Sequence, residues 1–195
     1  VKFYGFDEAN DVVIKNMQLL ESGSVFDLYI DGELFGHFDL PLYGEHMVMN
    51  AAAAITVVKE IGLNADVIAE LLKTFKNAKR RFAEDKVGDA VIIDDYAHHP
   101  TEIKVTLNAV RQKYPNRRLV VVFKPNTYSR TKDFTQEFID AFNVADMTYL
   151  TEIDCNRERQ EDYPGVTSHI IIDKLNNGDI ISDETIIYNY CNWQV

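Results

Sequence analysis

The second half of the sequence alternates short apolar runs with stretches of helical periodicity, and this rhythm limits the fold more than any other feature. Three apolar runs predict strands, at Ala90–Tyr96, Arg118–Phe123 and Met147–Ile153. Apolar residues at helical spacing predict three helices between and after them, at Pro100–Tyr114, Lys132–Phe142 and Thr167–Leu175. Strands that are apolar without alternation are typical of parallel sheets covered on both faces. We therefore expect an α/β fold with a Rossmann-like, mostly parallel sheet and helices on both faces.

The first 80 residues carry a different pattern, a hairpin followed by helices. Ser24–Leu40 alternates apolar and polar residues, and the dipeptide Asp31–Gly32 within it favours a type I′ turn between two strands. Val48–Ile61 is alanine-rich and apolar nearly all round, which predicts a buried helix that ends at Gly62. A second helix is expected at Asp66–Phe75, and its apolar face would consist of Val67, Leu71 and Phe75.

The basic stretch Lys76–Arg81 separates these two patterns and indicates a domain boundary. We therefore divide the chain into residues 1–80 and 81–195. The chain begins at Val1 inside an apolar stretch and ends at Trp193–Val195 like the start of a strand. Both ends are what we expect of a fragment of a longer protein.

Composition narrows the class of protein further. The formal net charge is −11, which argues against a general nucleic-acid binder, because such a protein needs a basic face. A few placed Arg and Lys residues could still hold a small anion. The two cysteines, Cys155 and Cys191, form no CxxC motif, and no apolar run approaches the length of a membrane span. With no signal-peptide pattern either, we expect a cytoplasmic protein with no membrane span.

Two polar loops follow the first two predicted strands of the parallel sheet, where ligands bind in open sheets of this kind. For the first loop, Asp94–Pro100, four interpretations compete: a helix cap with solvated charges, a nucleotide and substrate site, a phospho-receiver site, or a metal site. The metal site would use Asp94, Asp95, His98 and His99, but adjacent histidines rarely face one ion. The receiver fold would need an aspartate between Asp95 and Lys124, and none is there.

The two loops together resemble the C-terminal domain of the Mur ligases. DDYAHHPTEI followed by FKPNTYSRT carries the resemblance, GEHMVMNAAAAI is similar to a stretch of the family's central ATPase domain, and KRRF is similar to the linker between the two domains. By this resemblance, residues 1–80 are the end of the central ATP-binding domain. Residues 81–195 are the C-terminal domain, lacking its last strand.

The resemblance implies an ATP-dependent carboxylate–amine ligase of peptidoglycan precursor synthesis, with ATP and Mg²⁺ as cofactors. Within the family, the best match joins L-alanine to UDP-N-acetylmuramate through an acyl phosphate. Two alternatives remain: the recycling ligase that adds a tripeptide to the same nucleotide, and a non-catalytic nucleotide-binding module. The family's phosphate-binding loop and UDP-binding domain would precede this chain, so the isolated fragment is expected to be inactive.

Particular residues take roles by the same resemblance. Asn50 would contact adenine, since an amide offers a donor and an acceptor to a purine edge. His46 would lie near the second magnesium ion, while Asp95 and Tyr96 would lie beside the ribose and the nucleotide. Arg81, in the linker, would reach the γ-phosphate when the domains close, because a guanidinium fork suits phosphate oxygens. Without this resemblance, we would interpret Arg81 as part of a run of solvated charged residues.

The amino-acid substrate would meet two further side chains. His98 would lie near the incoming alanine, as a proton-handling or positioning residue, whereas His99 is expected to cap the helix that starts at Pro100. Arg130 would hold the alanine carboxylate; the alternative is a surface partner of Asp133. Departures from the family pattern occur at Met47, Lys124, Asn126 and Thr127.

Overall fold

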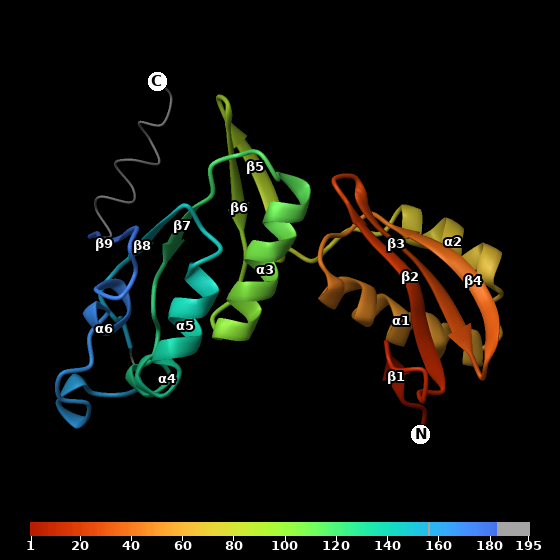
Figure 1. Cartoon of the computed structure of the whole chain (residues 1–195), viewed down its shortest axis with the longest axis horizontal. Coiled ribbons are helices and arrows are strands. Elements are labelled where there is room, and N and C mark those ends of the chain that lie inside the picture. The colour runs from red at the N-terminus through yellow and green to blue at the C-terminus, as the bar shows by residue number, and fades with distance from the viewer. Residues whose placement is uncertain (156, 183–195) are drawn as a thin grey trace. The chain divides into compact units, whose positions relative to one another are not determined.

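A computed structural model describes residues 1–155 and 157–182 (Figure 1). The chain forms two compact units. The first comprises Val1–Ala78 with Asn108–Pro115, and the second comprises Lys79–Leu107 with the chain from Asn116 onward. The strand expected to begin at Trp193–Val195, and the missing strand expected after it, lie outside the described residues.

The first unit is built on a four-stranded sheet in the order β1-β2-β3-β4. Its strands are β1 (Tyr4–Gly5), β2 (Val12–Leu20), β3 (Gly23–Ile30) and β4 (Glu33–Leu40). The hairpin is confirmed: Ile30 pairs with Glu33, and both Asp31 and Gly32 between them have positive φ, as a type I′ turn requires.

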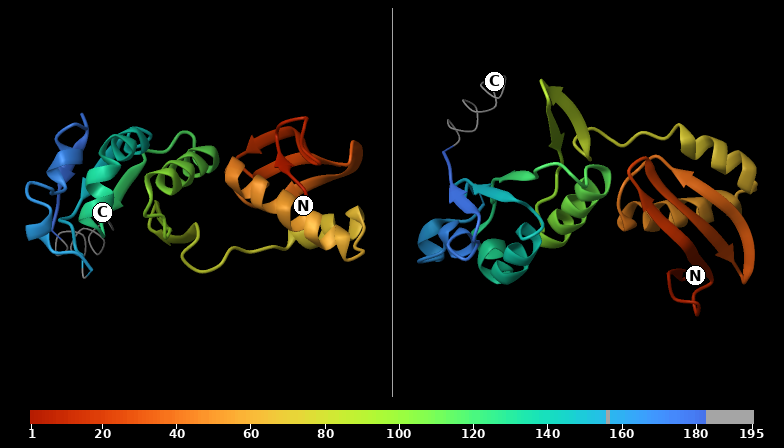
Figure 2. Two further views of the ribbon diagram at one scale, coloured as in Figure 1. Left: turned by 90° about the horizontal axis from the view of Figure 1, so that it is seen from below. Right: turned by 45° about the horizontal axis from the view of Figure 1, so that its top comes forward.

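Two helices, α1 (Glu45–Glu60) and α2 (Ala65–Lys73), cover one side of this sheet (Figure 2). The prediction that the first is buried all round was wrong, because Val57 is 65% exposed and α1 buries one face only. The predicted face of α2 was also wrong. Val67, Leu71 and Phe75 are exposed, and the neighbouring stripe packs on the core through Ala65, Ile68, Ala69 and Leu72.

The second unit contains a parallel sheet in the order β7-β8-β9. Its strands are β7 (Val120–Phe123), β8 (Met147–Leu150) and β9 (Gly178–Ile180). The strand predicted from Ala90 is β6 (Ala90–Asp94), and it pairs antiparallel with β5 (Ala83–Val87) rather than with β7. Gly88, at φ 58°, makes the tight turn between them. The expected α/β fold is confirmed, but β9 takes part in the parallel sheet where the strand from Ala90 was expected.

Helices α3 (Pro100–Lys113), α5 (Thr135–Phe142) and α6 (His169–Ile172) share one core with the parallel sheet. The helix predicted at Lys132–Phe142 is two helices. The first is α4 (Tyr128–Asp133), and Phe134, whose backbone is not helical (φ −118°, ψ 28°), separates it from α5. A short 3₁₀ helix, Gln160–Asp162, lies in the long segment between β8 and α6. In the part of the chain that the structure describes, no helix has the length and apolarity needed to cross a membrane.

Candidate functional site

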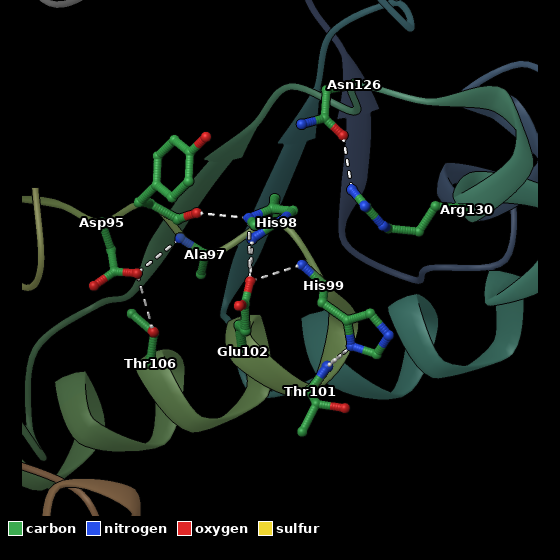
Figure 3. Close-up of polar contacts among 10 residues, drawn as sticks. Asp95, Ala97, His98, His99, Thr101, Glu102, Thr106, Asn126 and Arg130 are labelled. Carbon is green, nitrogen blue, oxygen red and sulfur yellow. Dashed lines mark hydrogen bonds and ion pairs between the residues drawn. The ribbon is translucent and has the colours of Figure 1, made fainter. Parts of the chain in front are cut away.

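The two polar loops of the second unit come together at one place. Residues 95–99 follow β6 and enter α3, and residues 124–127 follow β7 and enter α4. The rings of His99 and Phe134 meet edge-to-face, with centroids 4.8 Å apart, so the first loop packs against the junction of α4 and α5. Figure 3 shows polar contacts of the first loop, together with Asn126 of the second loop and Arg130.

Asp95 ties the first loop to the linker before it. Its Oδ2 accepts a hydrogen bond from the backbone N–H of Phe82 at 2.8 Å. Its Oδ1 accepts from Ala97 N at 2.8 Å and from the Thr106 hydroxyl at 3.4 Å (Figure 3). The N–H of Tyr96 also donates to the carbonyl oxygen of Arg80, at 3.0 Å. Both oxygens of Asp95 are therefore used inside the protein, so a ribose contact would have to share or replace them.

The linker has an unusual backbone on both sides of Arg81. Arg80 and Phe82 have φ values of 56° and 53°, a region that residues with a Cβ rarely occupy. The guanidinium carbons of Arg80 and Arg81 lie 5.3 Å and 5.6 Å from the centre of the Tyr96 ring, in cation–π contact. Arg80 also lies 3.5 Å from the carboxylate of Asp94. The linker is thus clamped to the first loop while Arg81 stays exposed.

The start of α3 is capped by side chains of the HHPTE motif. Glu102 accepts hydrogen bonds from the backbone N–H groups of His98 and His99, at 2.9 Å and 3.1 Å. His99 Nδ1 accepts from Thr101 N at 3.3 Å, so the expected capping role of His99 is confirmed. Glu102 itself was missed, although an acid three residues after the N-cap is the usual sign of a capping box.

The imidazole of His98 is oriented by the same cap. Its Nδ1 lies 3.0 Å from the carbonyl oxygen of Tyr96 and 3.2 Å from the carboxylate of Glu102. Because both of these groups only accept hydrogen bonds, Nδ1 carries the proton. In a neutral ring Nε2 is then the proton acceptor, which leaves one nitrogen suited to receive a proton or to contact an amine.

The capping bonds of Glu102 predict a pH-dependent stability. Burial acts to raise the pKa of the Glu102 carboxyl, but the N–H groups of His98 and His99 favour its ionised form, and the pKa lies below its ordinary value. A carboxyl with a lowered pKa stabilises the fold above its unfolded value of about 4.3, and this stabilisation is lost as pH falls through the folded pKa. In urea unfolding, Glu102→Gln should therefore have a lower free energy of unfolding than wild type near neutral pH. This difference in free energy should disappear in acid.

Glu137→Gln is a matched control for the loss of one carboxylate. Glu137 is exposed on α5 and forms no hydrogen bond or ion pair with other described residues. If the difference in free energy of unfolding between Glu102→Gln and wild type is the same at neutral and acid pH, Glu102 does not cap α3 through its ionised form.

Arg130 lies in α4, and its Nη1 donates to the Oδ1 of Asn126 at 2.9 Å (Figure 3). Among residues 1–155 and 157–182 Arg130 forms no ion pair, and the alternative pairing with Asp133 is not present. The hydrogen bond to an amide fixes the side chain without neutralising its charge. Arg130 can therefore still bind a carboxylate through its remaining donors.

In the first unit, His46 and Asn50 lie one turn apart on α1. Asn50 is exposed, whereas His46 is half-buried, with its ring against Gly44; a Cβ on Gly44 would lie 2.7 Å from that ring. The described residues contain no group of three or more His, Cys, Asp or Glu that could hold a metal ion. The metal interpretation of the Asp94–His99 loop is therefore not supported within this part of the chain.

Comparison with known proteins agrees with the resemblance in the two loops. The profile of the family described as Mur ligase, glutamate ligase domain, matches residues 80–191, more than half of the chain. The chain belongs to the Mur ligase family. Over 175 residues, or 90% of the chain, it is 45% identical to the UDP-N-acetylmuramate–L-alanine ligase of Lactococcus lactis subsp. lactis. It spans 39% of the length of that relative.

Solved structures of Mur ligases share the fold. The UDP-N-acetylmuramate–alanine ligase of Thermotoga maritima superposes with a TM-score of 0.77 over 96% of this chain and 41% of its own, at 20% identity. The MurF ligase of the same organism, solved in complex with ADP, gives 0.69 over 98% of this chain and 42% of its own, at 21% identity. At these identities the likeness concerns the fold alone.

Proposed function

We propose that this chain serves in an ATP-dependent ligase that joins L-alanine to UDP-N-acetylmuramate, a cytoplasmic step of peptidoglycan precursor synthesis. The observation that carries the proposal is the 45% identity to a ligase of that name over 90% of the chain. The remainder of such an enzyme, with its UDP-binding domain and phosphate-binding loop, would be contributed by sequence outside these 195 residues.

The proposed reaction has two steps. The muramoyl carboxylate attacks the γ-phosphorus of ATP and ADP leaves; the amine of alanine then attacks the acyl phosphate, forms the amide bond and releases phosphate. Negative charge builds up on phosphate oxygens in the first step, so a placed guanidinium lowers the barrier. Arg81 would supply it, because it is exposed, carries a permanent charge and is held in a fixed linker.

Three further residues would contact the nucleotide. The exposed amide of Asn50 offers a donor and an acceptor to adenine. Asp95 and Tyr96 would lie beside the ribose, although the bonds of Asp95 to Phe82 and Ala97 also give it a positioning role in the linker.

The second step needs an amine that faces the acyl phosphate and a carboxylate held away from it. Arg130 would bind the carboxylate of alanine with its planar fork. His98, with Nε2 available as an acceptor, would contact the ammonium group and receive its proton before attack. Both roles require positioning more than chemical reactivity, as is usual when the reactive group is already an acyl phosphate.

Magnesium would assist phosphoryl transfer by neutralising charge on ATP. The described residues contain no group of three or more His, Cys, Asp or Glu side chains that could hold this ion. Mg²⁺ prefers oxygen ligands, whereas His46 offers an imidazole nitrogen. We propose that sequence outside these 195 residues supplies the oxygen ligands of the ion and that His46 lies near it.

A direct assay separates the proposal from its alternatives. The intact protein that contains this chain is supplied with ATP and UDP-N-acetylmuramate, and kcat/KM is measured for L-alanine and for the tripeptide. We expect alanine to be preferred by at least about 100-fold, because a pocket shaped for a small amino acid excludes the longer acceptor. The opposite preference would indicate the recycling ligase. Tight nucleotide binding without turnover of either acceptor would indicate the non-catalytic module.

A further inference from the structure

The segment between β8 and α6 contacts the loop after β7 and the helix α4, which carries Arg130. The carboxylate of Asp154 lies 3.0 Å from Lys124 Nζ, and the N–H of Asp154 donates to the carbonyl oxygen of Pro125 at 3.1 Å. The rings of Tyr163 and Tyr128 stack 5.9 Å apart, at an interplanar angle of 15°. The segment thus contacts both the loop after β7 and the first residue of α4.

Glu158 makes the central contact of this set. Its Oε2 accepts a hydrogen bond from the backbone N–H of Ser129 at 3.0 Å, and its Oε1 accepts from the Ser129 hydroxyl. These bonds hold the pKa of the Glu158 carboxyl below its ordinary value, and the bond from the hydroxyl has the larger effect. Glu158 is therefore ionised at neutral pH, next to the residue before Arg130.

The helix that carries Arg130 lacks a cap of its own. Thr127 stands at the N-cap of α4, but its side chain makes no capping hydrogen bond, and its hydroxyl is buried without a partner among the described residues. Ser129 is the second residue of that helix, the one whose N–H a cap normally binds. Glu158, 29 residues further along the chain, supplies the acceptor instead.

The same arrangement leaves Arg130 available. Glu158 is hydrogen-bonded to Ser129 and acts on Arg130 only as a nearby negative charge, while the guanidinium of Arg130 is hydrogen-bonded to Asn126 at 2.9 Å. A carboxylate that paired directly with Arg130 would compete with the substrate, whereas one that caps the helix orients the arginine without occupying it.

We propose that Glu158 is a positioning residue for the amino-acid substrate. It caps α4 and thereby fixes the orientation of Arg130. This inference rests on the proposed role of Arg130 in binding a carboxylate. It predicts that the segment after β8 determines how tightly the amino acid binds, although Glu158 does not touch it.

The test compares Glu158→Ala with Glu161→Ala in the intact protein. Glu161 is exposed in the same segment and forms no hydrogen bond or ion pair with other described residues, so it controls for the lost charge. Because small misplacements of a binding group cost up to about 100-fold, we expect Glu158→Ala to raise the KM for alanine about 10- to 100-fold. The KM for ATP should change by less than about threefold, as expected of a group that acts on one substrate.

A conservative variant separates positioning from folding. The amide of Glu158→Gln can still accept from Ser129 N and donate to its hydroxyl, so the KM for alanine should return to within about threefold of wild type. Equal losses in kcat and in both KM values for Glu158→Ala would instead indicate a structural role and overturn the proposal. A KM for alanine no higher than that of Glu161→Ala would also overturn it.

Amide hydrogen exchange without substrate keeps this test independent of the substrate assignment. If Glu158 caps α4, exchange at residues 128–131 should be faster in Glu158→Ala than in Glu161→Ala. If wild type proves to use a different amino acid, the proposed function fails, and the same KM comparison with that amino acid still decides the role of Glu158. Unchanged exchange would overturn the capping role whatever the substrate is.

Discussion

Replacing Arg81 by alanine in the intact protein should lower kcat by about 30- to 1,000-fold, while the KM for ATP changes little. The loss corresponds to about 2–4 kcal/mol of transition-state stabilisation, the range found when one charge-stabilising donor is removed. Arg81 is suited to this role because it is exposed and its linker is fixed by the bonds of Asp95 and Tyr96. A contact that forms mainly in the transition state affects kcat rather than binding.

Arg80→Ala is the matched control for this experiment. Arg80 adjoins Arg81 and contacts the same ring of Tyr96, but it also lies 3.5 Å from the carboxylate of Asp94. Its removal deletes the same charge from the linker, and exposed ion pairs of this kind contribute less than about 1 kcal/mol. If Arg81→Ala and Arg80→Ala have the same kcat, Arg81 is part of a solvated linker and has no role in phosphoryl transfer.

Local signals were sufficient for part of the fold. The Asp31–Gly32 turn and the apolar strands at Ala90 and Met147 follow from residue types that have few alternatives. Other elements carry no such signal. β2 contains Lys15, Asn16 and Gln18, and its register shifts at a bulge where Asn16 has φ 51°, so the alternation that marks a strand is broken. β5 has the sequence AEDKV and an exposed centre, so no apolar run marks it as a strand.

The site divides in the same way between local and long-range information. Both loops could be located because each is a run of polar residues after an apolar strand, although only the second follows a strand of the parallel sheet. The contacts made by their side chains could not be located from sequence. Asp95 reaches Phe82 across 13 residues and Glu158 reaches Ser129 across 29, and only the tertiary fold determines those pairs. The resemblance to the family therefore predicted which residues would contact substrates, but not the positioning contacts of Asp95 and Glu158.

Arg130→Ala should raise the KM for alanine by about 10- to 150-fold, because a hydrogen bond to a charged group contributes about 1.5–3 kcal/mol. The carboxylate of a free amino acid takes no part in bond formation, yet it must be held so that the amine faces the acyl phosphate. The net charge of −11 opposes the approach of an anion, so a local cation is needed. The KM for ATP and the stability of the fold should change little.

Two further substitutions separate geometry from charge. Arg130→Lys should recover only part of the loss, because an ammonium group makes a point contact where a guanidinium makes two parallel hydrogen bonds. Lys132→Ala removes the same charge from an exposed position of the same helix and should leave the KM for alanine within about twofold of wild type. Equal effects of Lys132→Ala and Arg130→Ala would reduce the role of Arg130 to general electrostatic attraction.

Asn126 provides the decisive control, because its Oδ1 holds Nη1 of Arg130 at 2.9 Å. Asn126→Ala should raise the KM for alanine less than Arg130→Ala does, since the guanidinium remains but loses its fixed orientation. Adding Asn126→Ala to Arg130→Ala should then cause no further loss, because the amide acts only through the arginine. If the effects of the two substitutions on the KM for alanine instead multiply, Asn126 binds the amino acid independently. If alanine kinetics survive Arg130→Ala intact, the carboxylate is held elsewhere, and the proposed substrate loses its main structural support.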